Sequence, residues 1–149
     1  MYRDASNQSG DFSEVTACLD LIKQGWIVNT PSSRDCVYDL LVDTGRDSDA
    51  RFQTIQVKTM SGNSITKIID RSKEVVSKNG KTRNSLDYAD HGIDWLVGVN
   101  KDGECFFYHY DTYSQISSKS FSVLKYPPDQ FPTFDVPNRH RKIKKDDNE

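Results

Sequence analysis

The fold of this chain is decided by two neighbouring stretches, Tyr38-Asp39-Leu40-Leu41-Val42-Asp43 and Thr54-Ile55-Gln56-Val57-Lys58-Thr59. Apolar and β-branched residues dominate both stretches, which is typical of β-strands. The Gly-Arg-Asp-Ser-Asp segment between them favours a turn, so the two stretches predict a β-hairpin. We expect the rest of the chain to be arranged around this hairpin.

The second strand alternates between apolar and polar residues. Because successive side chains of a strand point to opposite faces, Ile55 and Val57 are expected on one face and Gln56 and Lys58 on the other. Asp39 on the neighbouring strand would join Gln56 and Lys58 in a small polar cluster at an edge of the sheet. Such a cluster could hold a cation, and we expect the chemistry of the protein there.

Length and composition indicate one domain spanning residues 1–149. Hydrophobic residues make up 35% of the chain and charged residues 28%, which is polar for a globular protein but not typical of disorder. No apolar run approaches the ~18 residues of a membrane helix, and the N-terminus does not resemble a signal peptide, so we expect a cytoplasmic protein. The scattered cysteines, Cys18, Cys36 and Cys105, predict reduced thiols rather than disulfides or a zinc site.

The net charge of −2 hides two basic blocks. Residues 58–83 carry seven basic side chains and two acidic ones, and residues 139–145 carry five basic side chains and no acidic one. Blocks of this kind indicate contact with nucleic acid. A solvated hairpin and a solvated tail would explain them equally well at this point.

A helix is predicted over residues 11–24, where Val15, Cys18, Leu19 and Ile22 recur at helical spacing. Asp11 can cap the helix, and Glu14 stands three residues later, as in a capping box. Glu14 also lies at the edge of the apolar stripe, so its side chain could point toward the sheet rather than toward water.

The remaining pattern predicts a mixture of strands and short helices. Residues 64–69 and 74–78 look like the strands of a polar hairpin, which would form an arm over about 62–85 projecting from the body. An extended segment is expected over 127–137, and a charged tail over about 138–149. Further strands are predicted at 26–29, 36–43, 51–60, 93–100, 104–110 and 121–126, with short helices near 88–92 and 112–117.

The order of these elements resembles the PD-(D/E)xK nuclease superfamily, in which a helix with an acid precedes a strand with Asp and a strand ending in Lys. The resemblance is closer to small bacterial nucleases in which glutamine replaces the second acid, the group that includes the homing endonuclease of a cyanobacterial group I intron. It covers roughly residues 10–110. The matching motifs are Gly10-Asp11-Phe12-Ser13-Glu14-Val15, Gly25-Trp26-Ile27-Val28, Tyr38-Asp39-Leu40-Leu41-Val42-Asp43, Ile55-Gln56-Val57-Lys58-Thr59, Leu86-Asp87-Tyr88-Ala89-Asp90 and Ile93-Asp94-Trp95-Leu96.

The resemblance implies an α/β fold with a restriction-endonuclease-like core, a mixed β-sheet flanked by helices and a protruding basic β-hairpin. It also implies a Mg²⁺-dependent site in which Asp39 is the principal metal ligand. The backbone carbonyl of Val57 and the carboxylate of Glu14 would complete the metal shell, while Lys58 would orient water or stabilise charge on the phosphate. Gln56 stands where an acid is usual, so a tightly bound second metal is in doubt.

These residue types suit the hydrolysis of a phosphodiester. A cation polarises the phosphoryl oxygen and lowers the pKa of an attacking water, and Mg²⁺ prefers oxygen ligands. Other interpretations remain open. Glu14 could serve only as a helix cap, Asp39 could form a structural ion pair with Lys58, and Gln56 and Lys58 could face solvent. Asp35 and Asp43 are rival metal ligands.

The function that the sequence favours is a site-specific endonuclease acting on double-stranded DNA, most like a homing endonuclease. One chain carries one site, so cutting both strands would require a dimer or tetramer built about a two-fold axis. No membrane and no organic cofactor are expected. A Holliday-junction resolvase, a restriction-type nuclease and a DNA-binding module without catalysis are the alternatives. The basic hairpin fits the major groove, with DNA contacts from Lys67, Arg71, Lys73, Lys78, Lys81 and Arg83.

Overall fold

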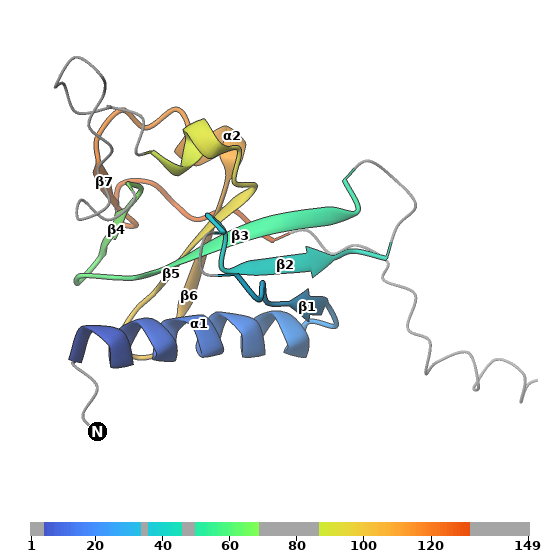
Figure 1. Cartoon of the computed structure of the whole chain (residues 1–149). Helices are drawn as coiled ribbons and strands as arrows, with labels where there is room; N and C mark the ends of the chain where they lie inside the picture. Colours follow the sequence, from blue (N-terminus) through green and yellow to red (C-terminus); the bar gives the residue numbers. More distant parts are fainter. Residues whose placement is uncertain (1–4, 34–35, 46–49, 69–86, 132–149) are drawn as a thin grey trace, which may run out of the picture.

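The computed structural model describes residues 5–33, 36–45, 50–68 and 87–131. A mixed five-stranded sheet forms its centre, with the long helix α1 (Ala5–Lys23) across one face (Figure 1). The strand order is β1-β2-β3-β5-β6, and only β3 and β5 pair in parallel. The strands are β1 (Ile27–Asn29), β2 (Leu40–Asp43), β3 (Phe52–Thr59), β5 (Trp95–Val99) and β6 (Cys105–His109).

The predicted hairpin is present as the antiparallel pair of β2 and β3, with Leu40 opposite Ile55. An ion pair closes its turn end, where Arg51 Nε lies 2.9 Å from Asp43 Oδ1. The position of the hairpin differs from the expectation in one respect. Because β3 also pairs with β5, it is the central strand of the sheet, so the polar cluster on β3 does not lie at a sheet edge.

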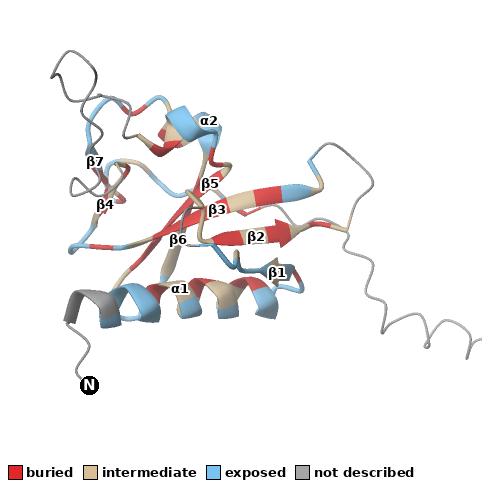
Figure 2. Ribbon diagram, viewed as in Figure 1, coloured by how far each residue is buried: buried red, intermediate tan, exposed pale blue. Residues whose placement is uncertain are grey.

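Helix α1 begins at Ala5 rather than at Asp11, so Asp11 and Glu14 lie inside the helix and form no capping box. Its sheet-facing side also differs from the prediction. The buried residues are Ser13, Ala17 and Leu21, whereas much of the predicted apolar stripe is exposed on the outer side (Figure 2). Small side chains let the helix approach the sheet closely, and the Ser13 and Thr59 hydroxyls lie 2.7 Å apart.

The core between α1 and the sheet is apolar and rich in aromatic rings. Phe131 lies at its end, with ring centroids 5.3 Å from Trp26 and 4.6 Å from Trp95. The preceding backbone is bound to β6, where the Asp129 N–H donates to the Phe107 carbonyl at 2.7 Å. The predicted extended segment is therefore correct as far as residue 131, and the remainder lies outside the described residues.

The opposite face of the sheet carries a second, smaller layer. It contains the two-stranded sheet of β4 (Ser64–Thr66) and β7 (Ser120–Ser122), the 3₁₀ helix η2 (Tyr88–His91) and the short helix α2 (Tyr110–Tyr113). A second apolar cluster packs these elements onto the sheet.

The predicted arm is wrong at its beginning, because β4 belongs to the body and pairs with β7. Ile65 on β4 is fully buried and lies so close to Gly98 that a Cβ added there would stand 2.4 Å from the Ile65 Cδ1. Glycine at position 98 therefore permits β4 to pack on β5. The second predicted strand of the arm, 74–78, lies outside the described residues.

No helix among the described residues is long and apolar enough to cross a membrane. Cys18, Cys36 and Cys105 are free thiols. Burial, together with the negative charge of Asp20, raises the pKa of Cys105 to about 11, so this thiol stays protonated at neutral pH.

Candidate active site

Asp39 is held against the central strand by two hydrogen bonds. Its backbone N–H donates to the Ile55 carbonyl at 2.8 Å, and its carboxylate accepts from the Val57 N–H at 3.0 Å. Its neighbours Leu40 and Val42 belong to the core beneath α1. Asp39 itself precedes β2, and its hydrogen bond to the Val57 N–H places its carboxylate beside the backbone of β3, next to Gln56 and Lys58 in the sequence of that strand.

The environment of Asp39 disfavours its charge. Burial raises the pKa of its carboxyl group, and the Val57 N–H and the positive charge of Lys58 offset this rise only in part. A buried carboxylate without sufficient compensation is costly. A cation bound at this position would supply the missing compensation.

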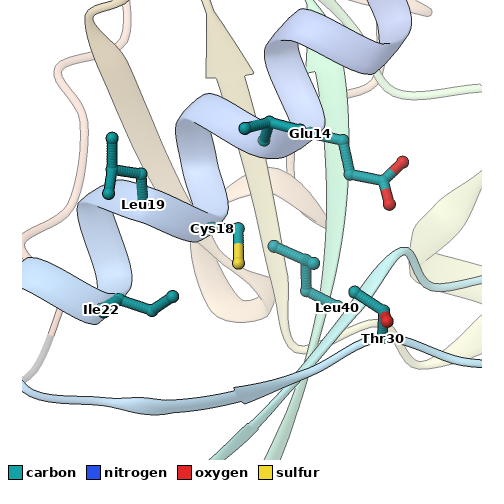
Figure 3. A pocket seen from close by; sticks show the side chains of 7 residues that line it. Glu14, Cys18, Leu19, Ile22, Thr30 and Leu40 are labelled. Atoms are coloured by element: carbon teal, nitrogen blue, oxygen red, sulfur yellow. The ribbon is translucent and has the colours of Figure 1, made fainter.

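Glu14 brings a second carboxyl group to the same region from the interior of α1. Burial raises the pKa of Glu14, and the negative charges of Asp39 and Asp11 raise it further. The interpretation of Glu14 as a helix cap only is wrong, because α1 begins at Ala5. In the close view, the Glu14 carboxylate lies at one end of a groove and points away from Leu19 and Ile22 (Figure 3).

Gln56 is only 8% exposed, so it does not belong to a solvent-facing stripe. Its Nε2 donates to the carbonyl of Val57 at 3.3 Å. The carbonyl expected to bind metal is therefore engaged by this amide. Turning the amide group by half a turn would present its oxygen instead, and both oxygens could then face one cation.

The Lys58 ammonium contacts an aromatic side chain from η2. Its Nζ lies 3.3 Å from the hydroxyl of Tyr88 and 5.2 Å from the centroid of the Tyr88 ring. A cation over an aromatic face is attracted by the ring quadrupole. No role was predicted for Tyr88 from the sequence. The available signal was its place in one of the family-like motifs, Leu86-Asp87-Tyr88-Ala89-Asp90.

Lys67 is buried beneath η2, and its predicted contact with DNA is therefore wrong. The side chain is 2% exposed, and its Nζ lies 3.0 Å from Asp87 Oδ2. Nζ also donates to the carbonyls of Tyr113, at 3.1 Å, and Ile116. A buried ammonium needs such partners, and these ones fix η2 against α2.

Asp87 extends this link to Tyr88. Its carboxylate accepts from the Ala89 N–H at 2.8 Å and so caps η2, while the Tyr88 N–H donates to the Lys67 carbonyl at 3.1 Å. The buried ion pair therefore positions the aromatic ring that contacts Lys58. Lys67 therefore supports the site indirectly, by holding η2 and its Tyr88 ring in position.

Of the two alternative metal ligands, Asp43 lies among the described residues and Asp35 does not. Asp43 is bound by the Arg51 guanidinium and by the Gly45 N–H, at 2.8 Å, at the turn end of the hairpin. This pairing disfavours Asp43 as a metal ligand. Asp35 lies outside the described residues, as do five of the predicted DNA contacts and the basic tail. Those five are Arg71, Lys73, Lys78, Lys81 and Arg83.

Among the described residues, no group of three or more His, Cys, Asp or Glu side chains is arranged to hold a metal ion. The site instead offers two carboxylates, from Glu14 and Asp39, with the Val57 carbonyl and the Gln56 amide oxygen. These are all oxygen donors, which suits a hard cation that keeps several waters. Both acids have raised pKa values, so their negative charge is disfavoured in the folded chain and a bound cation would compensate it. The residue types therefore suit a hard divalent cation.

Comparison with known proteins gives a consistent result. A family model described as PD-(D/E)XK endonuclease matches residues 5–130. Among solved structures, the chain is similar to a bacterial homing endonuclease, I-Ssp6803I, with a TM-score of 0.60 and 14% identity over 97% of each chain. No curated protein sequence matches. The predicted α/β core is confirmed, whereas the protruding hairpin is not.

Proposed function

This chain belongs to the PD-(D/E)XK endonuclease family, and we propose that it is a Mg²⁺-dependent endonuclease that hydrolyses phosphodiester bonds in duplex DNA. One observation carries the proposal. The carboxylates of Glu14 and Asp39 are close enough for the charge of one to raise the pKa of the other, and Lys58 is close enough to lower the pKa of Asp39. Two acids and a lysine around one strand suit metal-assisted hydrolysis.

Each residue has a distinct role in the proposed reaction. Asp39, Glu14 and the Val57 carbonyl would hold Mg²⁺, which when bound polarises the phosphoryl oxygen and acidifies a water. The side-chain amide of Gln56 would rotate, so that its oxygen could become a further ligand of the same metal ion. Lys58, oriented by Tyr88, would stabilise the negative charge that develops on the phosphate.

We further propose site-specific cleavage of the homing type. The support is the shared fold with a bacterial homing endonuclease, together with the basic residues at positions 71–83. One chain offers one such site, so a dimer or tetramer would be needed to cut both strands. Lys67 is not part of the proposed DNA surface, because its ammonium is buried against Asp87.

The test is cleavage of a randomised duplex library with Mg²⁺ or with a chelator, followed by sequencing of the new ends. Metal-dependent ends that share one sequence would support the proposal. Four-way junctions of matched length, incubated in parallel, distinguish a junction resolvase. An Asp39→Asn chain, purified in the same way, controls for contaminating nuclease, because any cleavage that it retains does not come from the proposed site.

A second candidate is a DNA-binding module without catalysis. The observation that favours it is the hydrogen bond from Gln56 Nε2 to the Val57 carbonyl, which engages a proposed metal ligand. This module would bind duplex DNA and leave it intact at every Mg²⁺ concentration. Gln56→Glu separates the two candidates, since an added carboxylate should lower the Mg²⁺ concentration for half-maximal cleavage in a working nuclease and leave a binding module inactive.

A further inference from the structure

Of the proposed metal ligands, Glu14 alone comes from helix α1. Val57 lies on β3, and the Asp39 carboxylate accepts a hydrogen bond from the Val57 N–H at 3.0 Å. Lys58 is the next residue of the same strand. Glu14 projects instead from the interior of α1, so its position relative to the other three residues depends on how α1 is placed over β3.

Apolar packing alone does not set that placement with the precision that a metal site requires. Ala17 and Leu21 are fully buried on the sheet side of α1, but apolar contacts have no preferred direction. A shift of the helix by one residue would move Glu14 by about 1.5 Å and turn it by about 100°. Mg²⁺ requires near-ideal octahedral geometry with ligands at about 2.0–2.1 Å. A directional contact between α1 and β3 would therefore help to hold Glu14 as a ligand.

Ser13 and Thr59 make such a contact. Ser13 directly precedes Glu14, is 2% exposed, and is the polar residue among the buried residues that the structure describes on α1. Its Oγ lies 2.7 Å from Thr59 Oγ1, and Thr59 Oγ1 donates to the Ser9 carbonyl at 3.2 Å. Because a hydroxyl has one hydrogen and that of Thr59 goes to Ser9, Ser13 is the donor to Thr59. Two hydrogen bonds thus join one turn of α1 to the end of β3.

Thr59 is itself fixed on the strand that carries the other site residues. It pairs with Val99 of β5 and directly follows Lys58. Because successive side chains of a strand point to opposite faces, Thr59 faces α1, whereas Lys58 faces η2, where its Nζ lies 3.3 Å from the Tyr88 hydroxyl. Two consecutive residues therefore connect β3 to the layers on its two sides, and a movement of α1 along β3 would break the bond between Ser13 and Thr59.

We propose that Ser13 and Thr59 are positioning residues of the metal site, whose hydrogen bond sets the register of α1 on β3 and so holds the Glu14 carboxylate toward the cation bound by Asp39. The inference rests on the proposed function, because it requires that Glu14 and Asp39 share one cation. Both hydroxyls act through Glu14 and not on the metal or the phosphate directly. The competing explanation is a contact that stabilises the fold and has no effect on metal binding.

The test measures the dissociation constant of Mg²⁺ from the rise of Tm with Mg²⁺ concentration, alongside the Mg²⁺ concentration for half-maximal cleavage. Thr59→Val removes both hydrogen bonds with little change of shape and should weaken Mg²⁺ binding about tenfold, the lower end of the range for groups that orient metal ligands. Ser13→Ala, which keeps a good helix former, should cause a smaller loss, because Thr59 retains its bond to Ser9. Thr59→Ser keeps the hydroxyl and should bind Mg²⁺ as wild type does.

Two controls separate positioning from stability. Ser120→Ala removes one hydroxyl of another pair that joins two elements, Ser120 Oγ and Thr66 Oγ1, which lie 3.2 Å apart between β4 and β7. This variant should leave Mg²⁺ binding unchanged. In a Glu14→Gln chain, Thr59→Val should weaken Mg²⁺ binding no further, because both substitutions act on the same ligand. The Tm of each variant without Mg²⁺ measures its effect on the fold alone.

Wild-type affinity for Mg²⁺ in the folded Thr59→Val and Ser13→Ala chains would overturn the proposal and leave the pair a structural contact. A further loss of affinity in the Glu14→Gln chain would overturn it as well, because the effect would not pass through Glu14. The failure of the proposed function is distinguishable from both results. A wild-type chain whose Tm does not respond to Mg²⁺ refutes the proposed metal site and this inference with it, whereas equal Mg²⁺ binding by wild type and variants refutes the positioning role alone.

Discussion

The carboxylate of Asp39 accepts a hydrogen bond from the backbone N–H of Val57, 3.0 Å away across the β2–β3 pair. The N–H and the carbonyl of one strand residue point to the same side of the strand, so this bond holds the Asp39 carboxylate on the side of β3 toward which the Val57 carbonyl also points. Backbone geometry therefore holds one proposed ligand relative to another. The burial that raises the pKa of Asp39 makes this carboxyl sensitive to metal.

Asp39→Asn should abolish cleavage and leave specific DNA binding unchanged. The amide has nearly the shape of the carboxylate and can still accept from the Val57 N–H, but it brings no charge to the cation. Single-turnover cleavage and equilibrium binding to the same duplex measure the two properties. Full activity of this variant in Mg²⁺ would refute the role of Asp39.

The stability of the metal-free chain should depend on Glu14 and Asp39 through pH. Both folded pKa values are raised above the ordinary values of 4.5 and 3.8. A raised pKa contributes stability that is complete below the ordinary value and is lost as pH rises through the folded value. Wild type and the Glu14→Gln/Asp39→Asn double variant should therefore diverge with rising pH, the double variant becoming relatively more stable.

Mg²⁺ should reverse this divergence at neutral pH, because it binds the ionised carboxylates of the folded chain only. The Tm of wild type is expected to rise with Mg²⁺ near neutral pH but not in acid, where both carboxyl groups are protonated, and the Tm of the double variant should respond in neither condition. Thermal unfolding followed by circular dichroism gives all of these values. A difference between the chains that is independent of both pH and Mg²⁺ would argue against a shared cation site.

Lys58→Ala should slow the chemical step by about 10²-fold or more, the scale of one lost electrostatic or proton-transfer partner. Tyr88→Phe should cause a smaller loss, since the ring beneath the Lys58 ammonium remains and only the hydroxyl contact at 3.3 Å is removed. Rates at saturating enzyme separate chemistry from binding. If Lys58→Ala cleaves at the wild-type rate, the side chain has no part in the reaction.

Lys67→Met should destabilise the fold by about 3 kcal/mol, because it leaves the Asp87 charge and two carbonyls without their buried partner. Chemical denaturation measures this loss. Lys67→Met/Asp87→Asn should recover part of it, since the second change removes the uncompensated charge. DNA affinity of the folded variant should match wild type, and a reduced salt dependence of binding would show that Lys67 does reach the phosphates.

The predicted DNA contacts outside the described residues are tested by alanine variants at five positions: Arg71, Lys73, Lys78, Lys81 and Arg83. Residues on phosphates should lower affinity for all sequences and reduce the salt slope, while residues on base edges should relax preference at one position at a cost of about 1–3 kcal/mol. Binding to target and random duplex across a salt series distinguishes them. If all five behave as wild type, the basic residues 139–145 become the next candidates.

Two features of the sheet were predictable from local sequence alone: the β2–β3 hairpin and the alternation of side chains along β3. Alternation over residues 54–59 correctly separated Ile55 and Val57 from Gln56 and Lys58, because the two-residue period of a strand is a local property of the backbone. The turn between the two stretches likewise predicted the β2–β3 hairpin. In these elements the sequence pattern is sufficient, because side-chain alternation and a turn between adjacent strands depend on residues close together in the chain.

Tertiary structure decided which surfaces are buried. The apolar stripe of α1 predicted a core face, yet the helix packs through Ser13 and Ala17, because close approach to the sheet requires small side chains. Lys67 was predicted to contact DNA from a polar arm, but Asp87, 20 residues along the chain, lies 3.0 Å from its ammonium. Periodicity identifies the faces of an element, while the partner of each face is chosen by residues distant in the chain. The alternative in which Gln56 faces solvent was wrong for this reason, whereas the alternative in which Glu14 is only a helix cap failed because α1 begins at Ala5.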